Sequence, residues 1–197
     1  MTINHRALSD AQLEDVLLAG ARGLRPGTAS TCAEHMPRYA STAEHRLQAL
    51  QSLLGCAGEL RRRQSLQALV SSRTLLDTPS AAKDYLRLHF DGLDHECFVV
   101  IFLCAQHRVI TVEEMFRGTL TQTAVYPREV LKRVLDHASA AVFLAHNHPS
   151  GVAEPSRADE FLTQSLKSAL ALADARVLDH FIVAGDSVTS LAERGLV

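Results

Sequence analysis

The sequence has few cysteines, no long apolar run and no strong charge bias, and each absence excludes a class of protein. The four cysteines, Cys32, Cys56, Cys97 and Cys104, lack the C-x-x-C spacing of a zinc knuckle or a redox pair. Cys97 lies beside an apolar run and Cys104 within it, so we expect small buried side chains in a reducing compartment. That run, Phe98–Ala105, is far too short to span a bilayer.

We also expect no secretory signal, because the first six residues contain no apolar segment. We therefore expect a cytoplasmic protein without a membrane segment. The net charge of −2 gives no overall basic footprint for nucleic acid. The charge is uneven, however: residues 1–76 hold nine Lys and Arg against six Asp and Glu, and residues 77–197 hold eleven against sixteen. This shift indicates a domain boundary near Thr78-Pro79-Ser80.

A chain of 197 residues with 47% hydrophobic residues can form one ordinary domain and a small second one. We predict a helical N-terminal region over 1–76, with helices near 9–20, 41–54 and 59–70. Three arginines, Arg61 to Arg63, lie at the start of the third helix. Such a triplet is usually a solvated helix face, and the alternative is a phosphate contact.

Beyond Ser80 the sequence alternates between helical and extended patterns. This alternation predicts an α/β fold with a mixed sheet flanked by helices over 78–197. The expected helices are 81–90, 127–135 and 157–172, and the expected strands are 97–104, 109–115, 118–125, 140–145, 176–184 and 187–191.

The stretch Leu144–Asp159 contains the most informative polar residues. His146 and His148 end an apolar strand, and side chains two apart on a strand point to the same side, which leaves Asn147 facing away. Asp159 lies on the first turn of the next helix, where it can turn back toward them. Two imidazoles and a carboxylate leave one tetrahedral position open, as in catalytic zinc sites, where zinc generates a nucleophile from water.

Two other interpretations of this stretch stay open on chemistry alone. A bare H-x-H occurs often by chance. Ser156 and Asp159 also have the spacing of an N-cap and its third helical residue, so Asp159 can serve only to cap the helix.

Longer motifs add a resemblance. H-x-H, ten residues and Asp, with P-S-G after the second histidine, is similar to the JAMM (MPN+) metalloprotease motif. The segments F-R-G-T-L-T-Q, Y-P-R-E, H-N-H-P-S-G, P-S-R-A-D and L-D-H-F resemble the bacterial RadC family over about residues 78–197. The resemblance implies an MPN domain with a cytidine-deaminase-like fold. It also implies Zn²⁺ held by His146, His148 and Asp159, with a water completing the shell.

The same resemblance implies roles for two further residues. Glu96, just before the first core strand, matches the family glutamate, whose chemistry would be that of a general base; Glu113 and Glu114 are rivals that suit structural roles better. Ser156 matches a serine that can stabilise an oxyanion, with a plain N-cap as the alternative. His180 can orient a ligand or be a bonded core histidine. His95, His107 and His137 are expected to be solvated.

The N-terminal region departs from the family, which usually carries a helix-hairpin-helix module there. Ala57 stands where the second hairpin glycine belongs, so we expect a degenerate module. Two functions follow as hypotheses: a zinc-dependent hydrolase of a peptide or isopeptide substrate, or a DNA-associated or protein-interaction module whose MPN domain hydrolyses nothing. A nucleobase deaminase is excluded, because H-x-E and P-C-x-x-C are both missing.

Overall fold

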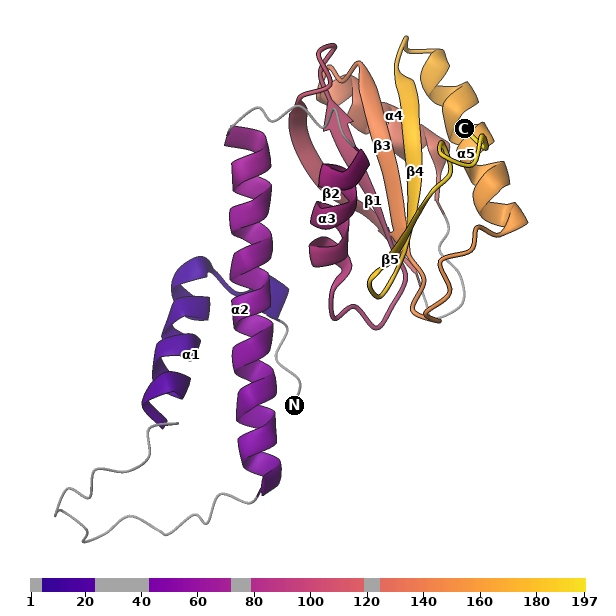
Figure 1. Cartoon of the computed structure of the whole chain (residues 1–197). Helices are drawn as coiled ribbons and strands as arrows, with labels where there is room; N and C mark the ends of the chain where they lie inside the picture. Colours follow the sequence, from indigo (N-terminus) through magenta and orange to yellow (C-terminus); the bar gives the residue numbers. More distant parts are fainter. Residues whose placement is uncertain (1–4, 24–42, 72–78, 119–124) are drawn as a thin grey trace, which may run out of the picture. The chain divides into compact units, whose positions relative to one another are not determined.

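The computed structural model describes residues 5–23, 43–71, 79–118 and 125–197 (Figure 1). The chain divides into two compact units, residues 1–63 and 64–197. Within the described residues, no helix is both long and apolar enough to cross a membrane.

The first unit is helical, as predicted. A 3-10 turn, η1 (His5–Ala7), precedes helix α1 (Asp10–Gly23), and α2 (Ala43–Ser71) follows, running past the boundary of the unit. Ser9 caps α1, because its hydroxyl accepts the Gln12 N–H at 3.3 Å while the Gln12 side chain accepts the Ser9 N–H at 2.8 Å.

Helix α2 corrects the prediction of two helices joined by a degenerate hairpin. Residues 53–58, where we expected the hairpin, lie in the middle of one continuous helix. Gly55 has a different purpose there: a Cβ at this position would lie 2.5 Å from Cε1 of the His5 imidazole. The glycine therefore makes room for a ring packed against the helix, at a cost of about 1 kcal/mol in helix propensity.

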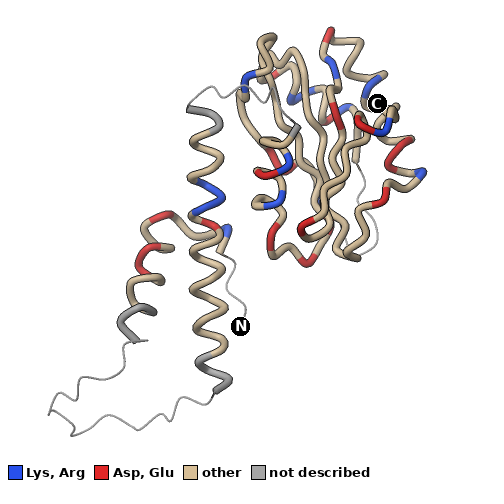
Figure 2. The backbone as a smooth tube through the Cα atoms, viewed as in Figure 1, with Lys and Arg blue, Asp and Glu red and all other residues tan. Residues whose placement is uncertain are grey.

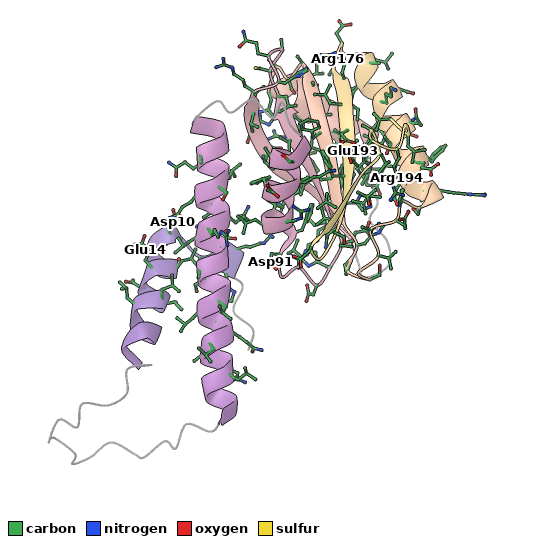
Figure 3. The ribbon with its side chains drawn as sticks, viewed as in Figure 1. Asp10, Glu14, Asp91, Arg176, Glu193 and Arg194 are labelled. Carbon is green, nitrogen blue, oxygen red and sulfur yellow. The ribbon has the colours of Figure 1, made fainter. Side chains whose placement is uncertain are left out.

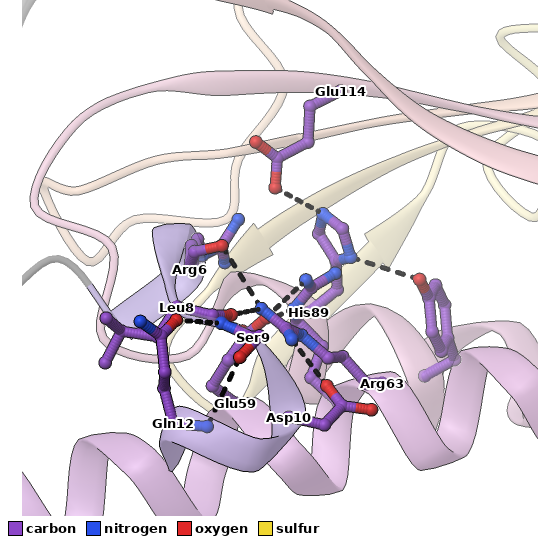
Figure 4. Close-up of polar contacts among 11 residues, drawn as sticks. Arg6, Leu8, Ser9, Asp10, Gln12, Glu59, Arg63, His89 and Glu114 are labelled. Atoms are coloured by element: carbon purple, nitrogen blue, oxygen red, sulfur yellow. Dashed lines mark hydrogen bonds and ion pairs between the residues drawn. The ribbon is translucent and has the colours of Figure 1, made fainter.

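The buried carboxylate of Glu59 binds two arginines of the triplet, of which Arg63 is labelled in Figure 4. Arg62 binds both carboxylate oxygens at 2.8 Å, and Arg63 binds one of them at 2.7 Å. Arg63 also pairs with Asp10 and donates to the carbonyl of Leu8 at 2.6 Å. Burial acts to raise the pKa of Glu59, but the hydrogen bonds and charges of both arginines lower it overall. Arg63 therefore fastens α2 to the start of α1, whereas the bonds of Arg62 to Glu59 lie within α2.

The second unit is built on a five-stranded mixed sheet of order β2-β1-β3-β4-β5, which confirms the predicted fold class. Only β3 and β4 are parallel neighbours, and the helix between them is the crossover that such a pair requires. The elements are α3 (Pro79–Phe90), β1 (Cys97–Leu103), β2 (Val109–Arg117), α4 (Pro127–Asp136), β3 (Ala141–Asn147), α5 (Arg157–Ala171), β4 (Arg176–Ala184) and β5 (Ser187–Ser190).

Each face of this sheet has its own apolar core. Helix α3 packs on one face through side chains that include Tyr85 and Leu86. Helices α4 and α5 pack on the other through Val130 and Leu166, among others (Figure 1). Strands β1 and β3 are buried along their whole length, which explains why their sequences are continuously apolar rather than alternating.

The predicted elements of this unit are confirmed within two residues at each end, with one exception. The strand expected over 118–125 falls mainly on residues 119–124, which lie outside the described residues. The domain boundary near Thr78 stays a prediction. Acidic and basic residues are interspersed along the 64–197 unit (Figure 2).

Candidate metal centre

The topology of the sheet brings three separate segments to one edge, by which we mean the side of the sheet where strands β3 and β4 end. Strand β1 is antiparallel to β3, with Phe98 opposite His146, so the residues before β1 lie beside the residues that end β3. The β3-α5-β4 crossover places the first turn of α5 at the carboxyl ends of β3 and β4. This is the edge at which α/β sheets usually bind their ligands.

The structure brings His146, His148 and Asp159 together at this edge. The two Nε2 atoms are 2.9 Å apart. Asp159 Oδ1 is 3.2 Å from His146 Nε2, and Asp159 Oδ2 is 3.7 Å from His148 Nε2. One ligand atom from each residue lies within 4.8 Å of the other two, so the group could hold a metal ion.

These separations fit a tetrahedral zinc ion. With ligand bonds of about 2.0–2.2 Å, such an ion holds its ligand atoms about 3.3–3.6 Å apart. The Nε2–Nε2 distance of 2.9 Å and the 3.2 Å from His146 Nε2 to Asp159 Oδ1 lie just below that range, and the 3.7 Å from His148 Nε2 to the other oxygen, Oδ2, lies just above it. Imidazole nitrogen and carboxylate oxygen are also donors that zinc accepts, and three protein ligands leave a fourth position for water or substrate.

The hydrogen bond of His148 Nδ1 leaves Nε2, the nitrogen that would bind a metal ion, with its lone pair free. Its Nδ1 lies 2.8 Å from the carbonyl oxygen of Val152, and a carbonyl can only accept. The proton is therefore on Nδ1, and the lone pair of Nε2 points toward His146 and Asp159. The loop after β3 thus orients the second histidine.

Asp159 caps a helix and also belongs, with His146 and His148, to the group of possible metal ligands that we call the donor cluster. Its Oδ2 accepts the Ser156 N–H at 2.7 Å and the Ser156 hydroxyl at 2.6 Å, while Oδ1 faces His146. Burial acts to raise the pKa of Asp159, but its interaction with the adjacent His146 ring and the hydrogen bonds of Ser156 hold it well below its usual value. The two interpretations of this carboxylate are therefore compatible.

Ser156 forms a complete capping box with Asp159. Its hydroxyl accepts a hydrogen bond from the Asp159 N–H at 3.2 Å and donates one to the Asp159 carboxylate. The side chain is exposed and lines the same cavity as the histidines. The N-cap role is therefore present, and a role in oxyanion stabilisation stays a prediction.

A cavity of about 610 Å³ opens at the donor cluster, and Glu96 lines it together with His146, His148 and Asp159. The rival glutamates are engaged elsewhere. Glu113 is bound by Arg133 and His137, and Glu114 pairs with His89 at 3.2 Å (Figure 4). Of these three glutamates, only Glu96 lines the cavity.

Asn147, between the two histidines, holds the backbone on both sides of Glu96. Its Oδ1 accepts the N–H of Cys97 at 2.7 Å, and its Nδ2 donates to the carbonyl of His95 at 2.9 Å. The carbonyl of Glu96 itself accepts the N–H of Gly118 at 2.8 Å. Asn147 is buried, so loss of either bond would leave a polar group without a partner. Strand periodicity predicts that Asn147 faces away from the histidines, but not what it binds.

A family model described as the RadC-like JAB domain matches residues 76–196 of this chain. The chain belongs to the RadC family. Its relatives include proteins named "UPF0758 protein" from Leptothrix cholodnii, 65% identical over 135 residues, and from Nitrosomonas eutropha, 59% identical over 135 residues. These matches cover 68% of this chain and 61% and 60% of the relatives, so the chain spans about three fifths of their length. A third "UPF0758 protein", from Variovorax paradoxus, is 45% identical over 205 residues and matches 97% of the chain and 90% of its own length.

The remaining histidines of the JAB domain differ from expectation. His95, His107 and His137 were expected to be solvated, but each is half-buried and has a partner. The partners are Asp94 for His95, Arg176 for His107 and Glu113 for His137. That prediction is wrong because element ends carry charged residues that pair with the imidazoles.

The loop between His148 and α5 is fixed at its far end. Arg194 binds the carboxylate of Glu154 through both Nη atoms, and Glu193 beside it pairs with Lys83 on α3 (Figure 3 labels Glu193 and Arg194). Gly151 has a φ of +81°, a conformation that glycine adopts without strain. The C-terminal turn of the domain therefore holds the loop that carries the His148 partner.

Asp179, beside His180, gives a pH-dependent prediction. Burial raises its pKa, against hydrogen bonds from Ser190, from the Ala192 N–H and from the His180 N–H that lower it. A raised folded pKa means that the stability from this group is fully present below the unfolded value of about 3.9 and is lost as pH rises through the folded value. We expect Asp179→Asn to lack this loss when free energies of unfolding are measured with urea across that pH range.

The comparison is the difference between wild type and Asp179→Asn at each pH. The wild type should lose stability relative to the variant as pH rises from about 4. A difference that stays constant, or that moves in the opposite direction, would contradict the raised pKa. Asp186→Asn, on the exposed β4–β5 turn, is the matched control.

Proposed function

We propose that this chain is a zinc-dependent hydrolase of peptide or isopeptide bonds. The observation that carries the proposal is the convergence of His146, His148 and Asp159 on one point at the wall of a cavity that Glu96 also lines. A zinc ion there would supply a nucleophile from water at neutral pH and polarise a carbonyl group.

In this proposal each residue of the chain has a defined task. His146, His148 and Asp159 hold the ion. Glu96 takes the proton from the attacking water as its oxygen bonds to the amide carbon, and passes that proton to the leaving nitrogen as the C–N bond breaks. The products are a carboxylic acid and an amine, and transfer of the remaining proton makes them a carboxylate and an ammonium ion. Ser156 faces the same cavity, and its hydroxyl, which donates to Asp159 in this structure, would have to turn away from that carboxylate to donate to the developing oxyanion.

The cavity lining supports an amide substrate over a phosphodiester. Among the described residues that line it, Glu96 and Asp159 carry negative charge and none is a lysine or arginine. A dication held there would be balanced by the two carboxylates, which leaves no positive charge to attract a phosphate. Apolar walls at Phe98, Phe161 and Leu162 suit a substrate side chain.

The proposal is tested by digesting a peptide library with the purified chain. The library contains linear peptides and peptides branched through a lysine side chain, and mass spectrometry identifies new amines. We expect cleavage by zinc-loaded protein and none after removal of zinc with a chelator, with activity restored when zinc is added back. Intact peptides at full zinc loading would contradict the proposal.

The alternative, a DNA-associated module, gains nothing from the described residues of the first unit. Arg62 and Arg63 are bound to Glu59, so of the arginine triplet only Arg61 is exposed. DNA binding stays a prediction of the sequence. Fluorescence anisotropy with branched and duplex DNA at two salt concentrations tests it, because micromolar binding with a steep salt dependence would support the alternative and absence of binding at low salt would remove it.

A further inference from the structure

A chain of buried hydrogen bonds runs behind the donor cluster and joins two of its members. Thr163 Oγ1 lies 2.6 Å from the backbone carbonyl of Asp159 and 2.6 Å from His180 Nδ1. His180 Nε2 lies 2.9 Å from His146 Nδ1. Thr163 and His180 are fully buried and His146 nearly so, so water does not compete for these bonds.

The first bond of this chain sets the direction of the others. The Asp159 carbonyl can only accept, so the single hydroxyl proton of Thr163 is donated to it. The Thr163 oxygen must then accept from His180, which puts the His180 proton on Nδ1. Complete burial favours the neutral form of His180, so its Nε2 carries a lone pair and accepts the Nδ1 proton of His146.

We propose that Thr163 and His180 are positioning residues that fix the proton of His146 on Nδ1 and so turn the lone pair of its Nε2 toward the metal. This inference rests on the metal site of the proposed function. Phe98 supports the same geometry, because its ring stacks on His146 at an interplanar angle of 17° and meets the edge of His180.

The chain of bonds also couples two of the three ligands. It starts at the backbone of Asp159, whose carboxylate faces His146 Nε2 at 3.2 Å, and it ends at Nδ1 of the same histidine. The side chains of Asp159 and His146, the first and last residues of this chain of bonds, therefore come together at the proposed metal position. A change in the Thr163 hydroxyl is expected to alter zinc affinity without touching a ligand.

The test uses three variants of the full chain. Thr163→Val keeps the shape of the side chain and removes the hydroxyl, whereas Thr163→Ser keeps the hydroxyl. Thr189→Val, on β5, makes the same chemical change at another position of the same unit and is the control. Zinc affinity is measured by competition with a chromophoric chelator. We expect Thr163→Val to bind zinc about 10- to 100-fold more weakly, with Thr163→Ser and Thr189→Val close to wild type.

Nitrogen NMR of the metal-free wild type reads the proton positions directly. We expect protons on Nδ1 of both His146 and His180. In Thr163→Val the His180 proton should move to Nε2, which forces the His146 proton onto its own Nε2 and blocks that ligand atom. A purely structural role for Thr163 would leave these positions unchanged.

Two results would overturn the inference: a wild-type His180 protonated on Nε2, or unchanged zinc affinity in Thr163→Val. The wild-type spectrum decides the proton positions even where the valine variant fails to fold. A wild type that binds no zinc would instead remove the proposed function, and the spectrum of the metal-free protein would still test the hydrogen-bond chain.

Discussion

Replacing Glu96 by glutamine is expected to leave zinc bound and to slow cleavage of a library-derived substrate by about 10²- to 10⁴-fold. Glutamine keeps the size of the side chain and its place at the cavity wall, but it cannot take a proton from water. Glu96 lies outside the donor cluster of His146, His148 and Asp159, so zinc content should not change. Zinc is measured by elemental analysis and cleavage by mass spectrometry on the same sample.

Glu114→Gln is the matched control for Glu96→Gln. It makes the same chemical change in a glutamate that pairs with His89, and this glutamate is absent from the cavity lining. Full cleavage by Glu96→Gln would show that another group transfers the proton. Loss of zinc from Glu96→Gln would instead show that this carboxylate is a ligand.

Replacing His148 by alanine is expected to abolish stable zinc binding. Loss of an outer hydrogen-bond partner of a ligand typically weakens metal affinity by about 10- to 100-fold, and loss of the ligand itself should exceed that. His148 follows the end of β3 and is partly exposed, so its removal leaves no large cavity in either apolar core. Elemental analysis after dialysis against a weak chelator measures the loss, and thermal unfolding checks the fold.

The control for His148→Ala is His107→Asn. His107 lies in the β1–β2 turn, beyond the end of β1 opposite to Glu96, and asparagine tolerates its φ of +56°. This variant should keep its zinc in full. Zinc retained at the wild-type level by His148→Ala would exclude this histidine as a ligand.

The strand-end histidines and the first-turn aspartate could be predicted because each follows from local geometry. A strand repeats every two residues, which puts His146 and His148 on one side. An N-terminal helix turn after a short loop brings Asp159 back to the same edge. The position of Glu96 at the cavity also agrees with the RadC resemblance.

The contacts that the sequence does not reveal are those between residues far apart along the chain. The bonds of Asn147 to residues 95 and 97 span about fifty positions, and they depend on the register of β1 against β3. Thr163 reads as an ordinary helix residue until β4 places His180 beside it. The failure at α2 has a different cause: the hairpin was expected from the family resemblance, but the segment is helical and Gly55 makes room for the ring of His5.

The two hydrogen bonds of the Asn147 side chain tie the segment before β1 to the end of β3. One side chain, between two histidines of the candidate metal centre, holds the backbone on both sides of the glutamate that we propose as the base. A displacement of the end of β3 would therefore be passed through these two bonds to the backbone on both sides of Glu96, and the spacing of Glu96 from His146 and His148 would tend to be preserved. A change that moves β3 as a body should therefore spare the alignment of Glu96 with the two histidines, whereas loss of the Asn147 side chain would release Glu96 from them.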